Sequence, residues 1–250
     1  MRVVVAGELP LAEELLKLCT AAGHSVTLYL VETLADAKTV GQLEGSAAIA
    51  DVAIECHNES KAAKRRLIKM LDGAQTLCVC ALPCSTTEIA SWAGQPEAVT
   101  GWGAVPPLEA GGMMEVAAAL QTSPEALAAA QTFWSSLGLK PAVVADGTGL
   151  VRARIVCALV NEAATALMEG VASTADIDTA MKLGTNYPRG PLEWGDLIGL
   201  DVVLGVMRGL HEDFGEDRYR PCPLLVRYVQ AGRLGRKTGR GFFEYNTASQ

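Results

Sequence analysis

The sequence predicts an α/β fold in which an N-terminal Rossmann-like, doubly wound domain is followed by an all-α C-terminal domain. Two observations predict this order. Short apolar runs alternate with helical patterns from the first residue to a Gly-rich break at residues 146–149. Beyond that break the apolar residues recur only at helical spacing. We therefore expect one domain over residues 1–146 and a second over residues 147–250.

The opening residues have the pattern of a β-α-β unit. Residues 2–7 form an apolar, β-branched run that ends in Gly7, residues 11–22 place leucines at helical spacing, and residues 26–30 alternate like a second strand. In a doubly wound sheet the first turn of such a unit faces the pyrophosphate of a dinucleotide. The turn after Gly7 is therefore the first candidate binding site.

The rest of the N-terminal half continues the alternation. Its expected elements are a strand over 48–56, a helix over 61–71, a strand over 77–82, helices that begin at Ser85 and Ser123, and a last strand over 140–145. The segment 34–45 is small and polar. The helix over 61–71 carries Lys64, Arg65 and Lys69, which either contact phosphate or form a solvated helix surface.

Residues 180–201 contain three helix boundaries in the C-terminal half. A helix that begins near Thr174 is expected to end at Gly184, because glycine readily takes the left-handed conformation that closes a helix. Pro191 suits the first position of the next helix, since that position needs no N–H donor. Gly199 is expected to end that short helix, and another follows it directly.

Composition excludes several classes of function. The 250 residues carry a formal net charge of −7, which argues against a nucleic-acid partner. No apolar run approaches the ~20 residues of a membrane helix, and the N-terminus lacks a signal-peptide pattern, so we expect a cytoplasmic protein. The seven scattered cysteines fit reduced, buried thiols. Cys78, Cys80 and Cys84 have no histidine nearby, so no metal site is expected.

Several segments resemble the 3-hydroxyacyl-CoA dehydrogenase family, including its 3-hydroxybutyryl-CoA type. The segments are residues 149–163, 180–201, 218–225 and 232–243. The resemblance implies an NAD-dependent oxidoreductase of fatty-acid or related acyl-CoA metabolism, with a homodimer formed through the helical domain. The family also has a helical hairpin that grips coenzyme A, for which the segment 34–45 leaves no room.

The cofactor turn departs from the family's pattern. The family's GxGxxG fingerprint falls on Gly7, Leu9 and Ala12. The side chain of Leu9 should obstruct the approach of a pyrophosphate, and Pro10 removes an N–H donor from the start of the helix. The acid that would bind the ribose falls at Leu30, and Glu32 comes two residues later. The resemblance therefore implies that NAD binding is weak or lost.

The catalytic pair also departs from the family's pattern. The family's histidine and the glutamate that holds it fall on Gly103 and Glu115. Glycine cannot titrate, and a missing general base typically forfeits ~10²–10⁴ in rate. His57 follows a strand end at the ligand edge of the sheet and is the best substitute proton carrier. The family's substrate-contacting asparagine falls on Ala153, while the neighbouring Arg154 is kept and is a candidate substrate contact.

Two functions compete at this point. The chain is either a working NAD-dependent dehydrogenase with a displaced base such as His57, or a catalytically inactive dimeric relative that acts as a binding or scaffolding partner. A third possibility is that an acyl-CoA or small ligand still binds at a polar pocket around Glu115 and Arg154. The basic residues near the C-terminus either bind a coenzyme A phosphate or form a solvated loop that closes the domain: Arg233, Arg236, Lys237 and Arg240.

Overall fold

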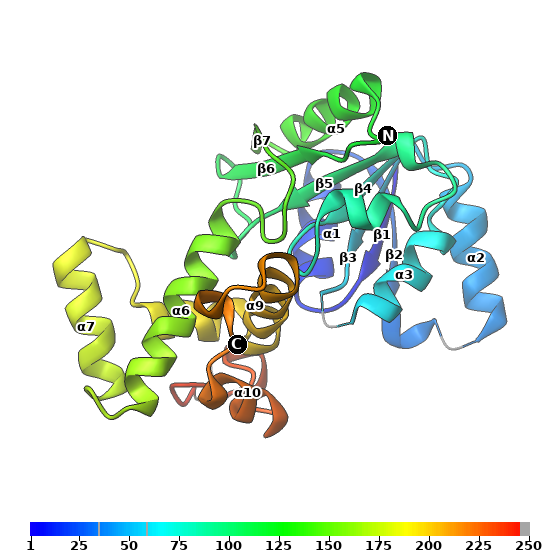
Figure 1. Ribbon diagram of the computed structural model, residues 1–250. Helices are drawn as coiled ribbons and strands as arrows, with labels where there is room; N and C mark the ends of the chain where they lie inside the picture. Colours follow the sequence, from blue (N-terminus) through cyan, green and yellow to red (C-terminus); the bar gives the residue numbers. More distant parts are fainter. Residues whose placement is uncertain (35, 59, 246–250) are drawn as a thin grey trace. The chain divides into compact units, whose positions relative to one another are not determined.

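The computed structural model describes residues 1–34, 36–58 and 60–245. The chain divides into two compact units, Met1–Val151 and Arg152–Gln250. The first is an α/β unit and the second is helical (Figure 1). The predicted fold class is therefore confirmed.

A seven-stranded sheet with the order β2-β1-β3-β4-β5-β6-β7 forms the centre of the N-terminal unit. The first five strands in sequence are parallel, β6 is antiparallel to β5, and β7 is parallel to β6. β3, β4 and β5 are buried along their whole length, which explains why they are nearly continuous apolar runs. The strands are β1 Arg2–Gly7, β2 Ser25–Leu30, β3 Val52–Cys56, β4 Thr76–Cys80, β5 Val99–Gly103, β6 Met113–Ala118 and β7 Lys140–Val144.

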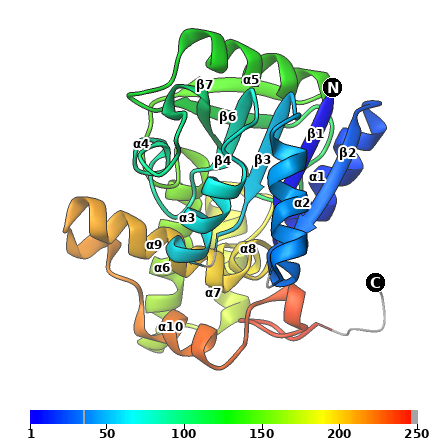
Figure 2. The same cartoon turned by 90° about the vertical axis from the view of Figure 1, so that its right-hand side faces the viewer.

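Helices cover both faces of this sheet. α2 and α3 lie side by side in front of it in Figure 2 and share one apolar core cluster with α4. The turn after α1 reaches α5, because His24 Nε2 lies 2.9 Å from Ser136 Oγ. Right-handed crossovers place α1 and α3 on opposite faces, since the chain moves in opposite directions along the sheet. The helices are α1 Leu11–Ala21, α2 Ala37–Ala47, α3 Lys61–Met70, α4 Thr86–Ala90 and α5 Pro124–Ser136.

Side-chain caps set the beginnings of four of these helices. Asp36, Ser60, Ser85 and Ser123 each accept a hydrogen bond from the backbone N–H three residues later. The cap at Asp36 belongs to α2, a full helix in a segment that the sequence described only as small and polar. That description was incomplete, because the apolar positions of α2 are few and only Leu43 and Ala47 are buried.

The C-terminal unit is built from five α-helices and short 3-10 turns in its described part. Pro191 occupies the first turn of α8 and Gly199 ends it at φ 101°, as the sequence predicted. The predicted end of α7 at Gly184 was wrong. α7 continues to Thr185, and Asn186 takes the left-handed conformation at φ 56°, which asparagine tolerates better than most residues. The helices are α6 Arg152–Met168, α7 Thr174–Thr185, α8 Pro191–Ile198, α9 Leu200–Phe214 and α10 Pro223–Gln230.

Two buried carboxylates hold the helical unit together through backbone groups. Asp178 of α7 accepts hydrogen bonds from the N–H groups of Leu192 and Glu193, both at 2.8 Å, and so caps the start of α8. Asp196 accepts from the N–H groups of Phe242 and Phe243 and thereby fixes the closing segment. Burial raises the pKa of both carboxyl groups above the ordinary value.

The seven cysteines are free and buried, as expected from the sequence. Burial raises the pKa of five of these thiols to about 12, so they stay protonated at neutral pH: Cys19, Cys78, Cys80, Cys84 and Cys157. Within residues 1–34, 36–58 and 60–245, no helix has the length and apolar character needed to cross a membrane.

The role of Asp178 can be tested by substitution. We expect Asp178→Ala to lower the free energy of unfolding by about 2 kcal/mol, because two N–H groups in the first turn of α8 lose their acceptor. Urea denaturation followed by circular dichroism measures this. Glu162→Ala, on the exposed side of α6, is the matched control and should change stability by less than about 0.5 kcal/mol. Equal effects of the two substitutions would contradict the assignment.

Candidate functional site

The carboxyl ends of β1 and β3 form the switch point of the sheet. β2 lies on one side of β1 and β3 on the other, so the chain leaves these two neighbouring strands in opposite directions. Gly7, the last residue of β1, is paired with Leu30 of β2 and Cys56 of β3. Doubly wound proteins bind their ligands in the crevice outside such a point.

Gly7 is required by packing between the strands. A Cβ atom at this position would lie 2.2 Å from the Sγ atom of Cys56, so no side chain fits there. The Cys56 thiol in turn donates to the carbonyl of Ala6 at 3.6 Å. The glycine predicted as a cofactor residue therefore has a structural reason of its own to be present.

The start of α1 uses its own backbone donors. The N–H of Ala12 donates to the carbonyl of Glu8 at 3.0 Å, and the N–H groups of Glu13 and Glu14 donate to the carbonyl of Pro10. Pro10 itself has no N–H. These groups would otherwise be the donors that a helix N-terminus offers to a phosphate.

The other predicted cofactor residues lie around the same turn. The side chain of Leu9 is 44% exposed at the start of the turn, while Ala12 is fully buried in α1. Glu32 lies in the 3-10 turn Val31–Thr33 that follows β2, with its side chain exposed. The structure therefore gathers Gly7, Leu9 and Ala12 at the end of β1 and puts Glu32 beyond the end of β2.

A carboxylate and an imidazole meet at the switch point. His57 Nδ1 lies 2.8 Å from Glu8 Oε2, a separation at which a protonated imidazole and a carboxylate form an ion pair. The other oxygen of Glu8 accepts a hydrogen bond from the N–H of Asn58 at 2.8 Å. The His57 side chain is only 6% exposed, and its Nε2 has no hydrogen-bonding partner among the described residues. Glu8 and His57 thus join the residues that directly follow β1 and β3.

A buried ion pair lies beneath this contact. Lys64 Nζ is 2.5 Å from Glu55 Oε2, and both side chains are fully buried. Lys64 also donates to the carbonyl of His57 at 2.8 Å. The Glu55 carboxylate accepts from the N–H groups of His57 and Cys80, at 2.7 and 3.2 Å. Burial by itself would lower the pKa of Lys64, but the facing Glu55 carboxylate raises it above the ordinary value.

The sequence assigned Lys64 to a solvated or phosphate-binding face, and that assignment was wrong. The buried side of α3 consists of Lys64, Leu67 and Ile68, so the lysine occupies a position of the apolar stripe. Helical spacing could have identified it, because Lys64 lies three and four residues before two buried apolar residues. The feature that could have identified Glu55 as a buried residue is a single acidic residue inside an otherwise apolar strand.

Gly103 and Glu115 lie opposite each other on β5 and β6. Glu115 is 2% exposed, and its Oε2 accepts a hydrogen bond from the N–H of Val151 at 3.3 Å. A Cβ atom at Gly103 would lie 2.9 Å from the Cδ1 atom of Leu150, a buried residue with a left-handed backbone at φ 48°. The side chain of Leu150 therefore fills the space beside Gly103.

The two residues predicted to be catalytic are not brought together. His57 follows β3, and Glu115 is on β6, with β4 and β5 between these strands. Three strand spacings correspond to about 14 Å. Glu115 therefore has no imidazole from His57 to hold, and each residue belongs to a separate cluster.

Arg154, the candidate substrate contact, is bound within the helical unit. Its Nη2 donates to the hydroxyl of Tyr219 at 2.5 Å, and its guanidinium carbon lies 4.6 Å from the centre of the Phe214 ring. A guanidinium over aromatic rings is stabilised by cation–π attraction. These contacts connect α6 with the end of α9 and the turn that follows it.

The basic residues near the C-terminus are also partnered inside the helical unit. Lys237 Nζ lies 2.5 Å from Asp201 Oδ2, and Arg236 Nη2 lies 3.2 Å from Glu193 Oε1. Arg233 packs on the Tyr228 ring, and Arg240 pairs with Glu244. This arrangement favours a loop that closes the domain. Within the described parts of the chain, no group of three or more His, Cys, Asp or Glu side chains is placed to hold a metal ion.

A mostly parallel sheet with a switch point beside β1, followed by an all-helical unit, defines a protein of the dinucleotide-binding Rossmann class with a second, helical domain. Residues 11–147 match the family model described as 3-hydroxyacyl-CoA dehydrogenase, NAD binding domain, and residues 149–245 match the C-terminal domain of the same family. The chain belongs to the 3-hydroxyacyl-CoA dehydrogenase family.

Individual relatives agree with this assignment. A probable 3-hydroxybutyryl-CoA dehydrogenase of Bacillus subtilis is 38% identical over 224 residues, which cover 86% of this chain and 76% of that protein. The crystal structure of (S)-3-hydroxybutyryl-CoA dehydrogenase PaaH1 from Ralstonia eutropha is similar with a TM-score of 0.79 and 29% identity, over 99% of this chain and 100% of that chain. FadB2 of M. tuberculosis gives a TM-score of 0.83 at 26% identity, over 98% and 99% of the two chains.

The buried ion pair predicts a large effect of a single substitution. Lys64→Met should lower the free energy of unfolding by about 3–5 kcal/mol, because it leaves the Glu55 carboxylate buried without its cation. The double variant Glu55→Gln/Lys64→Met removes both charges and should recover part of this loss. Chemical denaturation of the three proteins measures the difference. A single variant as stable as the parent chain would show that the pair does not contribute.

Proposed function

We propose that this chain, acting in the cytoplasm, does not carry out hydride transfer by the family's usual route and serves instead as a homodimeric binding or scaffolding partner. The observation that carries the proposal is Leu150 beside Gly103. In the family, the histidine aligned with Gly103 takes the proton of the substrate hydroxyl. Here that position has no side chain, and a buried leucine occupies the neighbouring space.

The residues at the switch point support the same proposal, because they do not fit a dinucleotide pyrophosphate. The Glu8 carboxylate lies beside Gly7, where the phosphates of a dinucleotide would approach, and like charges repel. The N–H groups of Ala12, Glu13 and Glu14 are already engaged by carbonyls of the turn. We infer that NAD binds weakly or not at all.

The competing function is a working dehydrogenase with His57 as its base. The observation in its favour is the pairing of His57 Nδ1 with Glu8, while Nε2 lacks a described partner. A carboxylate behind one ring nitrogen orients an imidazole and strengthens it as a base at the other nitrogen. Against it, the side chain is nearly fully buried, and substrate and cofactor would both need to approach an edge already occupied by protein side chains.

Calorimetric titration with NADH, repeated in the presence of acetoacetyl-CoA, separates these functions. We expect no saturable NADH binding tighter than about 100 µM, which corresponds to roughly −5.5 kcal/mol. Acetoacetyl-CoA added alone reports whether an acyl-CoA still binds without the cofactor. A turnover assay with the same two compounds should give no NADH oxidation above the rate without protein.

Two outcomes would contradict the proposal. Turnover at a rate usual for enzymes, on the order of 1–10³ s⁻¹, would favour the competing hypothesis of a working dehydrogenase. In that case His57→Gln should abolish the activity if His57 is the base. Saturable NADH binding without turnover would retain the catalytic part of the proposal and overturn the part that concerns the cofactor.

The homodimer is proposed through the helical unit. Large apolar side chains are exposed there, including Ile155, Val171 and Leu183, the last of them 82% exposed. Exposed apolar surface of this kind is typical of subunit interfaces. The family resemblance implies a homodimer through the same domain.

We expect light scattering to give twice the 26.3 kDa mass of one chain. Leu183→Lys should reduce this mass to that of the single chain, because it buries a charge in the interface. Leu120→Lys changes an even more exposed leucine in the N-terminal unit and should leave the mass unchanged. A single-chain mass for the unaltered protein would contradict the homodimer.

A further inference from the structure

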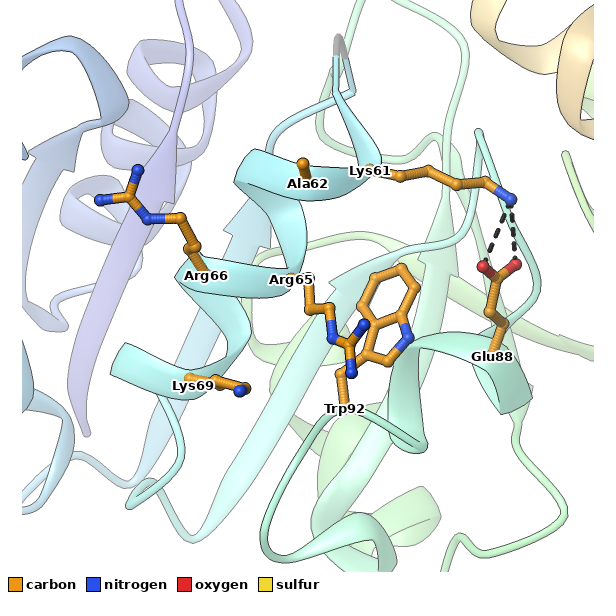
Figure 3. Close-up of a pocket in the computed structure, with 7 residues that line it drawn as sticks. All are labelled: Lys61, Ala62, Arg65, Arg66, Lys69, Glu88 and Trp92. Carbon is orange, nitrogen blue, oxygen red and sulfur yellow. Dashed lines mark hydrogen bonds and ion pairs between the residues drawn. The ribbon is translucent and has the colours of Figure 1, made fainter.

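A pocket of about 480 Å³ lies between α3 and α4 in the N-terminal unit (Figure 3). Pockets for small molecules usually have ~300–1,000 Å³. Five of its lining residues carry the argument below: Lys61, Arg65 and Lys69 on α3, and Glu88 and Trp92 on or after α4. Lys64 belongs to the same helix but faces the sheet, so the pocket uses the opposite side of α3.

Trp92 supplies a flat apolar surface at this pocket. Its side chain is partly buried and packs against the apolar cluster shared by α2, α3 and α4. The backbone N–H of Trp92 donates to the carbonyl of Ile89, which fixes the backbone just after α4. A tryptophan held in this way and open on one side can stack with an aromatic ligand.

Two cations that line the pocket with Trp92 form no ion pair with a described carboxylate. They are Arg65 and Lys69, and both side chains are exposed. The side chains of Arg65 and Trp92 both line the pocket and overlap in the view of Figure 3. Lys61, in contrast, is bound to Glu88 at 3.2 Å, so that pair forms a fixed edge of the pocket. In a chain with a net charge of −7, this local positive charge is directed at an anionic ligand.

We propose that this pocket binds a nucleotide, with its base stacked on Trp92 and its phosphate held by Arg65 and Lys69. A planar apolar surface beside two cations matches a planar base that carries a phosphate. A base without a phosphate would leave the cations without a ligand, and a phosphate without a base would leave the Trp92 surface uncovered. Arginine suits the phosphate because its guanidinium can donate two parallel hydrogen bonds. The site does not depend on the proposed function, since it shares no residue with the switch point or with Gly103.

Titration with ADP and with adenosine 3′,5′-bisphosphate tests this proposal. We expect saturable binding of at least one of them, below about 1 mM. ADP carries both phosphates at the 5′ position, whereas adenosine 3′,5′-bisphosphate carries one at each position. The ligand that binds more tightly therefore identifies which phosphate position the two cations contact. Adenosine and inorganic phosphate should each bind at least ~10-fold more weakly, because each lacks one of the two contacts.

Three variants locate the site. Arg65→Gln and Trp92→Leu should each weaken binding roughly 10-fold, by removal of the phosphate contact and of the stacking surface. Trp92→Phe keeps an aromatic ring and should retain most of the affinity. Lys17→Gln, an exposed lysine of α1, removes the same charge from another helix and should have no effect beyond about 2-fold.

The proposal is overturned if neither nucleotide binds below about 1 mM, or if Arg65→Gln binds as tightly as the parent chain. It is also overturned if inorganic phosphate binds as tightly as ADP, since Trp92 would then have no part. Thermal unfolding of each variant confirms that a loss of binding is not a loss of folding. Because Arg65 is exposed, its variant tests the proposal even if changes at Trp92 prevent folding.

Discussion

The carboxylate of Glu55 is the interaction on which the ligand edge of the N-terminal unit depends. It accepts hydrogen bonds from Lys64 of α3, from the N–H of His57 and from the N–H of Cys80 at the end of β4. The carbonyl of the same residue accepts from the Trp102 indole on β5. A fully buried carboxylate is costly unless its oxygens are satisfied, and here satisfying them fixes two strand ends and one helix together.

This arrangement also positions the residues at the switch point. With its N–H held by Glu55 and its carbonyl held by Lys64, His57 has a fixed backbone, and its ring is aimed at Glu8. The side chains of Glu8 and His57 thus lie at the edge of the sheet where doubly wound proteins bind their ligands. Accessible positive charge lies instead on the outer side of α3, and the cations near the C-terminus are paired with acids or packed on aromatic rings within their own unit.

The fold was predictable because its signals are local. Strands buried on both faces are visible as apolar runs, and caps such as Ser85 or the Pro191 and Gly199 pair depend on a few neighbouring residues. The contacts around the candidate site were not predictable from the sequence. They join residues far apart in sequence, such as Glu8 with His57 and Leu150 with Gly103, and no spacing rule connects them. Lys64 was misassigned because a charged residue in a basic helix has the pattern of a surface residue.

The position of Leu150 bears on what a side chain at position 103 would require. It packs with Ala81, Ala117 and Val144 in a small core cluster of its own, so the space beside Gly103 is not vacant but part of that core. A side chain introduced at position 103 would meet the Cδ1 atom of Leu150, so the end of that leucine would have to shift, and a smaller residue at position 150 would by itself leave a cavity. Positions 103 and 150 share this space, so substitutions at the two positions should not have additive effects on stability.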